Sequence, residues 1–249
     1  MKLIVNADDF GFSADVNQAI TTVIKQQACS NTTLMVNMPA TDEAVGLSVL
    51  NGFSDRIGLH LNLTDGFPLT DPIRGQKLFC DSDGNFNTGF HRGIHRFYLN
   101  KKEEDAVRLE FSAQIEKYLS YGFDLKHIDS HHHIHTNYSI FKILIPLLRK
   151  YEINSIRLTR NMFEEVSWGK NIYKRLLNNK IRQIAVTSNY LGSISDFEKY
   201  RHRIPETSIV EIAVHPVLSE EGILDMDVPY SKVVDAIRGE ELISYRNIW

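Results

Sequence analysis

Half of the histidines in this chain fall within one short stretch. Residues 127–135 read His-Ile-Asp-Ser-His-His-His-Ile-His and hold five of the ten imidazoles. Side chains alternate along extended backbone, so this stretch would present an imidazole or carboxylate at every second position of one face. That face would consist of His127, Asp129, His131, His133 and His135. Because histidine is the commonest metal ligand and a carboxylate can orient it through its second ring nitrogen, the stretch predicts a metal site.

The first apolar run of the chain ends in two adjacent carboxylates, Asp8 and Asp9. Placing both after a buried strand is costly unless a cation or hydrogen bonds hold them. Neighbouring like charges raise the pKa of one member, so the pair suits one metal ligand and one general base. A turn into a helix capped by Ser13 is the alternative interpretation of the same residues.

A third polar pattern occurs in an otherwise aliphatic run. On a strand, His60, Asn62 and Thr64 would share one face, while the intervening leucines would share the other. One polar face on a buried strand indicates a wet interior cavity. A hydrogen-bonded core histidine would also account for His60.

A single histidine precedes a proline near the end of the chain. Pro216 disfavours helical backbone at the residue before it, so His215 is expected to be extended at a strand end. An imidazole held there can transfer a proton near neutral pH, or it can simply cap a turn. Arg157 lies near another expected strand end, where it would contact a polar substrate or pair with surface carboxylates.

Secondary-structure elements must bring these residues together. Along the chain, short apolar runs alternate with segments whose apolar residues recur at helical spacing. Nearly continuous apolar runs are typical of parallel strands covered by helices. Seven such units predict a single α/β domain over residues 1–249, either a distorted TIM-like (β/α) barrel or an open doubly wound sheet. The expected strands are Lys2–Ala7, Thr32–Met38, Arg56–Thr64, Leu125–Ser130, Ser155–Thr159, Arg182–Ser188 and Ser208–His215. The expected helices are Ala14–Cys29, Asp42–Leu50, Glu103–Tyr121, Tyr138–Tyr151, Trp168–Asn179, Ser195–Arg203 and Ser231–Gly239.

In parallel α/β folds, ligand sites lie outside the carboxyl ends of the strands. The Asp8–Asp9 pair and three histidines occur at four of these ends, so we expect them to converge. One carboxylate with two imidazoles is a recurrent ligand set of a catalytic metal. A second carboxylate could then take a proton from the metal-bound water, and a further histidine could protonate the leaving group. These roles indicate hydrolysis of a C–N or C–O bond at a carbonyl. Another metal-dependent barrel hydrolase (an amidohydrolase or phosphoesterase) and a non-catalytic metal-binding protein remain alternatives.

Composition excludes several other classes of protein. The 249 residues contain 28 Lys and Arg against 31 Asp and Glu, a balance that argues against nucleic acid as a partner. No apolar run approaches the roughly 20 residues of a membrane span, so no membrane partner is expected. The two cysteines are too few for a disulfide framework, which favours a reducing, cytoplasmic location. A homodimer remains possible.

Four motifs, in this order, resemble the YdjC family of carbohydrate (chito-oligosaccharide) deacetylases. The resemblance spans nearly the whole chain and implies a distorted barrel of βα units. It also implies that the protein removes the N-acetyl group from an N-acetylglucosamine-type mono- or oligosaccharide and releases acetate. The partner would then be an acetylated amino-sugar substrate. The motifs are Asn-Ala-Asp-Asp-Phe-Gly (6–11), Gly-Leu-His-Leu-Asn-Leu-Thr (58–64), the histidine-rich stretch (127–135) and Val-His-Pro (214–216).

The resemblance further implies a role for each residue. Asp9, His60 and His131 would be the metal ligands, Asp8 the general base and His215 the general acid. The residues expected to support these groups or to contact substrate are Asn62, Asp129, His133, His135 and Arg157. The family resemblance implies Mg²⁺ as the divalent metal ion, whereas two imidazoles with one carboxylate suit Zn²⁺ or another transition metal at least as well.

The segment 65–93 is too long for an ordinary connection between elements. Long structured loops of this kind are often lids or binding loops, although a surface excursion is the alternative. Four of its ring-bearing side chains would wall a sugar groove by stacking. They are Phe67, Phe86, Phe90 and His91.

Overall fold

A curled parallel sheet forms the centre of the molecule, with neighbouring strands in the order β5-β4-β3-β2-β1-β7-β6. The computed structural model describes the whole chain except residues 92, 164, 227 and 249. All pairings along this path are parallel, so the seven strands finish at the same end of the sheet. The strands are β1 (Lys2–Phe10), β2 (Asn31–Leu34), β3 (Ile57–Leu61), β4 (His127–Ser130), β5 (Ser155–Ile156), β6 (Tyr190–Gly192) and β7 (Ile209–Val214).

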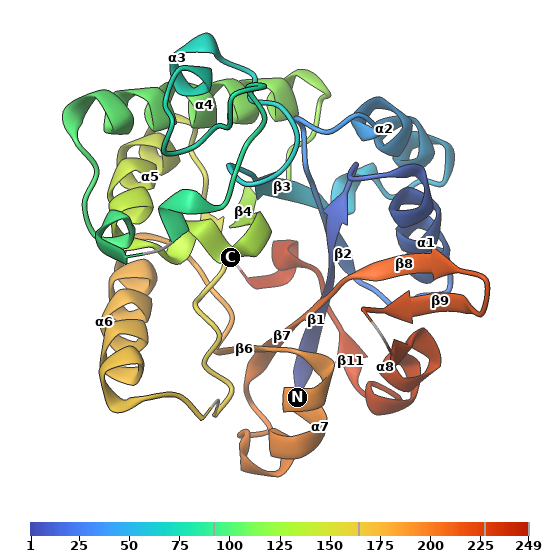
Figure 1. Cartoon of the computed structure of the whole chain (residues 1–249). Helices are drawn as coiled ribbons and strands as arrows, with labels where there is room; N and C mark the ends of the chain where they lie inside the picture. The colour runs from blue at the N-terminus through green and yellow to red at the C-terminus, as the bar shows by residue number, and fades with distance from the viewer. Residues whose placement is uncertain (92, 164, 227, 249) are drawn as a thin grey trace.

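The segment that leads into β6 pairs with the opposite edge strand, β5, at one isolated bridge among the described residues. Val186, in the segment before β6, pairs in parallel with Ser155 of β5. Figure 1 shows the helices outside the curled strands. The predicted distorted TIM-like barrel of about seven βα units is therefore confirmed.

Side-chain caps mark the start of two helices on the outside of the sheet, α1 and α4. Ser13 accepts a hydrogen bond from the backbone N–H of Val16, and Asn100 and Glu103 form a reciprocal capping box. Apolar side chains of the helices and strands then pack into one large buried cluster. The helices are α1 (Ala14–Lys25), α2 (Thr41–Leu50), α3 (Asp71–Arg74), α4 (Lys101–Ser120), α5 (Tyr138–Lys150), α6 (Trp168–Ile184), α7 (Ile194–Tyr200) and α8 (Tyr230–Ala236).

One expected strand is wrong. The residues 182–184 belong to helix α6, and the sixth strand is β6, which follows the expected range of 182–188. Leu177 and Ile181 are buried and Ile184 packs against the core, so the apolar residues continue a helical stripe at spacings of four and three. The apolar residues around position 184 therefore belong to the end of a helix.

The chain after β7 forms strands that the sequence did not predict. Strands β8 (Pro216–Ser219), β9 (Gly222–Asp225) and β10 (Val228–Pro229) make a small antiparallel sheet, and β11 (Glu241–Leu242) pairs with the start of β1. In the β8–β9 hairpin, Asp225 is the register partner of Pro216. The hairpin thus brings a carboxylate beside His215.

A search of the described residues finds no helix with the length and apolar character needed to cross a membrane.

The hydroxyl group of Tyr118 links helix α4 to the start of β3 and to the segment before β4. It lies 2.7 Å from the carbonyl oxygens of Ile57 and Leu125, and the side chain is 3 % exposed. We expect Tyr118→Phe to lower the free energy of unfolding by about 1–3 kcal/mol, because a buried acceptor loses its donor. Urea unfolding followed by circular dichroism measures the loss. Tyr98→Phe, at an exposed position, is the matched control, and equal losses in both variants would contradict the expectation.

Candidate metal centre and active site

A bulge at the end of β1 directs its two carboxylates to different parts of the site. The β1–β2 register shifts between Ala7 and Phe10, and Asp9 has a left-handed φ of 68°. Gly11 follows with a φ of 93°, and a Cβ there would lie 2.8 Å from the Met35 carbonyl oxygen. Only glycine fits this position without strain. The local backbone therefore departs from ordinary strand alternation, which lets adjacent carboxylates serve one site.

Asp9, His60 and His131 meet at a single carboxylate oxygen. Asp9 Oδ1 lies 3.0 Å from His60 Nε2 and 2.7 Å from His131 Nδ1. One ligand atom from each residue lies within 4.8 Å of the others. A carboxylate oxygen and two imidazole nitrogens that face one point form a donor set consistent with a divalent metal ion.

The carboxylates around this cluster favour positive charge. Burial would raise the pKa of Asp9, but hydrogen bonds with His131 and His60 hold it well below its usual range. Burial opposes protonation of His60, yet the charge and hydrogen bond of Asp129 raise its pKa to about 10. Burial also opposes protonation of His131, whereas hydrogen bonds with Asp65 and Asp9 raise its pKa to about 9. The cluster therefore attracts a cation, either protons or a metal ion.

The backbone turns directly after His131, so the expected five-residue face is wrong beyond β4. His132 and His133 have left-handed φ values of 51° and 53°, inside a short 3-10 segment. Such backbone is uncommon outside glycine and costs energy that the surrounding structure must offset. The turn brings His131 toward Asp9 and leaves His133 on the wall of the pocket.

Two histidines of this stretch lie away from the pocket. His127 is buried, stacks on Tyr245 at 3.5 Å between ring centroids, and bonds Ser155. His135 is fully buried, and its Nδ1 and backbone N–H contact the Oγ of Ser130, a residue of the pocket wall. Neither ring lines the pocket itself, and the expected supporting role of His135 stays a prediction.

Asp8 is bound by a buried guanidinium group. Nη1 and Nη2 of Arg157 donate to the two oxygens of Asp8 at 2.6 and 2.8 Å, and Asn6 donates a further bond at 2.8 Å. Burial would raise the pKa of Asp8, but the Arg157 charge and hydrogen bonds lower it below the usual range. Asp8 is therefore ionised at neutral pH.

Arg157 also contacts two carboxylates from other strands. Its Nη2 lies 2.8 Å from Asp129 Oδ2, and its Nε donates to Glu211. Burial lowers the pKa of Arg157, but the charges of Asp129, Asp8 and Glu211 hold it well above its usual value. Asp8, His60 and Asp129 also form a group with metal-ligand spacing, but the guanidinium already supplies a cation there.

His215 lies near Oδ2 of Asp8, whereas Asn6 contacts Oδ1. Its Nε2 is 3.7 Å from Asp8 Oδ2, and its side chain is 39 % exposed. The backbone N–H of His215 donates to Asp225 Oδ1 at 2.7 Å, which fixes the strand end next to the proline. Burial raises the pKa of Asp225. The imidazole is thus held within the pocket and open to solvent.

A pocket of about 500 Å³ contains most of these groups. Two hollows of about 630 and 670 Å³ are larger, but neither is lined by any of the candidate site residues. Chemistry rather than size therefore identifies the site. The ionisable residues of the pocket wall are Asp8, Asp9, His60, His131, His132, His133, Arg160, His215 and Asp225.

Asn62 holds the turn after β3, whereas two of the loop aromatics differ from expectation. Asn62 is fully buried and accepts hydrogen bonds from the backbone N–H groups of Thr64 and Asp65, and its expected role in supporting the site or contacting substrate stays a prediction. Phe86 and Phe90 are buried in the core, so they cannot stack on a sugar, whereas Phe67 is 55 % exposed. The side chain of His91 lies outside the described residues.

Sequence reasoning missed three carboxylates that contact the site: Asp65, Glu211 and Asp225. Asp65 directly follows the polar face of β3, so its position next to that strand end was a usable signal. Glu211 lies inside the apolar run of β7, where a carboxylate predicts a buried cationic partner. Asp225 lies in a hairpin without a comparable signal.

A parallel α/β barrel with a carboxylate–imidazole cluster at the carboxyl ends of its strands is the class of fold in which metal-assisted hydrolysis is common. The chain belongs to the YdjC-like family, whose sequence pattern matches residues 2–244. It is 30 % identical to a carbohydrate deacetylase of Clostridium beijerinckii, over 99 % of this chain and 95 % of that one.

A second relative matches part of the chain, and a solved structure shares its fold. A carbohydrate deacetylase of Vibrio cholerae is 38 % identical over 61 % of this chain and 57 % of its own. The fold is similar to that of an Enterococcus faecalis V583 protein described as a candidate cellobiose-phosphate cleavage protein. That crystal structure matches with a TM-score of 0.75 and 24 % identity, over 99 % of this chain and 98 % of the other.

We expect Arg157→Met to destabilise the protein strongly. Removing one partner of a buried ion pair costs about 3–5 kcal/mol, and here three carboxylates would lose their cation. Arg157→Lys keeps the charge without the planar fork, so it should cost less than the methionine variant. Chemical unfolding provides the measurement, and Arg175→Met, at an exposed position, is the control. Wild-type stability in Arg157→Met would show that the carboxylates do not need this cation.

Proposed function

We propose that this protein is a metal-dependent carbohydrate deacetylase. It hydrolyses the acetamide of an N-acetylglucosamine-type mono- or oligosaccharide and leaves a free amine and acetate. The observation that carries the proposal is the convergence of a candidate metal cluster, Asp9, His60 and His131, with the Asp8–His215 pair in one pocket. Membership of the YdjC-like family and the names of its relatives support the same activity.

In this proposal, Asp9 Oδ1, His60 Nε2 and His131 Nδ1 hold the ion. A bound divalent metal supplies Lewis-acid activation of the attacking water and of the acetyl carbonyl group. Two imidazoles with one carboxylate favour Zn²⁺ or another transition metal, whereas Mg²⁺ prefers oxygen ligands. Reconstitution with each metal in turn decides between them.

Asp8 and His215 carry out the proton transfers of the proposed reaction. The ionised Asp8 accepts a proton from the attacking water, and protonated His215 donates one to the departing nitrogen, so the amide becomes an amine and an acid. Arg157 keeps Asp8 in the form that accepts a proton, at the cost of making it a weaker base. The 3.7 Å separation of the two side chains lets one substrate group reach both.

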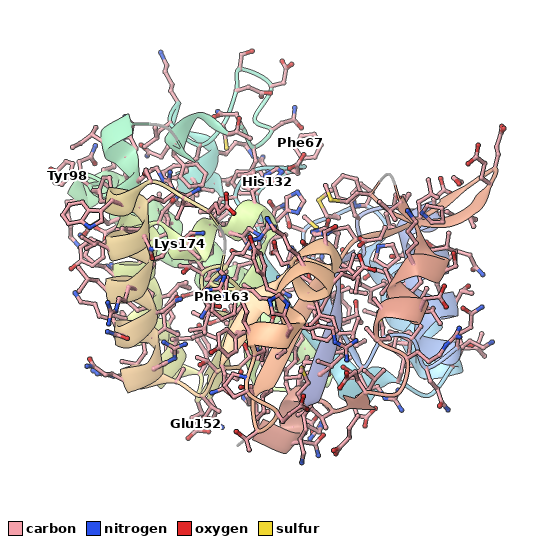
Figure 2. The ribbon with its side chains drawn as sticks, turned by 90° about the horizontal axis from the view of Figure 1, so that it is seen from below. Phe67, Tyr98, His132, Glu152, Phe163 and Lys174 are labelled. Atoms are coloured by element: carbon pink, nitrogen blue, oxygen red, sulfur yellow. The ribbon has the colours of Figure 1, made fainter. Side chains whose placement is uncertain are left out.

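Two exposed aromatic rings on the segments that follow Asp9 and Asp65 suit a sugar ring. Phe12 is 36 % exposed and its ring lies 6.1 Å from that of His131, and Phe67 is 55 % exposed. Figure 2 shows Phe67 and His132 at the same end of the molecule, with Glu152 at the other end. The apolar face of a pyranose would pack on these rings while its acetamide enters the pocket.

The direct test incubates metal-reconstituted protein with N-acetylated mono-, di- and trisaccharides and detects acetate by mass spectrometry. We expect acetate release that a chelator abolishes and that added metal restores. Parallel reactions with phosphate esters monitor phosphate. Phosphate release without acetate release would replace the proposal with a phosphoesterase.

Variants separate metal binding from proton transfer. We expect His131→Ala to lose bound metal and activity together. His215→Gln and Asp8→Asn should retain metal but lower kcat by about 10²–10⁴-fold, because general acid–base catalysis contributes that much. Metal content by mass spectrometry and acetate release are measured on the same samples.

The control for these variants is His202→Gln, which changes an exposed histidine outside the pocket. It should retain both metal and activity. Several ions per chain, with Asp8 and His215 dispensable, would instead indicate a metal-storage protein.

A further inference from the structure

Both histidines of the candidate metal centre have a carboxylate on the ring nitrogen that faces away from Asp9. His60 Nδ1 lies 2.6 Å from Asp129 Oδ1, while its Nε2 faces Asp9. His131 has the opposite orientation, with Nδ1 toward Asp9 and Nε2 3.1 Å from Asp65 Oδ2. Each ring thus lies between Asp9 and a second carboxylate, although the second carboxylates come from different elements.

The backbone of Asp65 is held by buried amide side chains. Asn62 accepts a hydrogen bond from the Asp65 N–H at 3.2 Å and donates to its carbonyl oxygen at 2.7 Å. Asn37 donates to the same carbonyl at 3.3 Å and to that of Phe67 at 3.0 Å. Both amides are buried, with 0 % and 8 % exposure. The position of Asp65 is therefore set by the core and does not depend on the exposed part of its loop.

A carboxylate at this position determines which nitrogen of His131 carries the proton. An ionised carboxylate only accepts hydrogen bonds, so Nε2 must be the donor in the neutral ring. The lone pair then lies on Nδ1, which is the nitrogen that faces Asp9. Carboxylates in this position fix the tautomer and orientation of metal-binding histidines.

We propose that Asp65 is a positioning residue that presents His131 Nδ1 to the metal ion, as Asp129 does for His60 Nε2. This inference rests on the metal centre of the proposed function but does not depend on its substrate. Asp65, His131 and His132 also have metal-ligand spacing among themselves. A second ion among these three residues would require the His131 ring to bridge two metals. The number of ions bound per chain distinguishes that arrangement from the one proposed.

The test measures the affinity of the full-length protein for Co²⁺ and Zn²⁺ by competition with a chromophoric chelator. We expect Asp65→Ala to weaken binding by about 10–100-fold, the usual effect of removing such a partner. Asp65→Asn should weaken it less, because the amide oxygen still accepts from Nε2. Asp83→Ala removes an exposed carboxylate of the same segment and should match the wild type.

The visible spectrum of the Co²⁺-loaded protein gives a second readout that general destabilisation does not produce. We expect the absorption bands to change in Asp65→Ala and not in Asp83→Ala, because the former alters how His131 binds the ion. Thermal unfolding of the metal-free variants checks that each is folded. A partly unfolded variant is replaced by Asp65→Asn for the same measurements.

Two results would overturn the inference. One is wild-type affinity together with an unchanged Co²⁺ spectrum in Asp65→Ala. The other is two ions per wild-type chain and one in the variant, which would make Asp65 a ligand of a second metal. Acetate release is not used here, so a protein with the expected metal affinities but no deacetylation would contradict only the proposed function.

Discussion

The arrangement of the site depends on one buried cation, the guanidinium group of Arg157. It contacts carboxylates from three strands, Asp8 on β1, Asp129 on β4 and Glu211 on β7. Without a cation between them, like charges this close in the barrel interior would repel one another or become protonated. Arginine suits the position because its planar fork can donate in several directions at once. Catalytic geometry and barrel stability are therefore linked through this side chain.

Asp129 connects that ion pair to the candidate metal centre. One of its oxygens faces Arg157 and accepts from Thr33, and the other contacts the His60 ring. The orientation of His60 is thus determined inside the barrel, whereas that of His131 is determined at the rim by Asp65. The core tolerates these buried charges because they are paired with one another, since leaving a charged member unpaired would cost more than apolar packing.

The barrel itself does not specify the reaction, since similar folds carry many activities. Its contribution is to place the ends of four strands at one rim, where short loops can hold side chains rigidly. Asp8, the base in the proposed mechanism, has two conflicting requirements: it must be ionised, and it must still accept a proton. Arg157 makes Asp8 available as a carboxylate but lowers its pKa, so its basicity near the pocket depends on how substrate binding alters that ion pair.

The sequence by itself determined the order of βα units and the strand ends at which chemistry would occur, because apolar periodicity and local motifs are properties of neighbouring residues. It did not determine which neighbours in space would meet. The left-handed turn after His131, the partners of Arg157 and the contact of Asp65 with the His131 ring arise only when distant strands pack together. The end of α6 was predicted as a strand because a short apolar run is compatible with either element, and its packing against the core shows that it continues the helix.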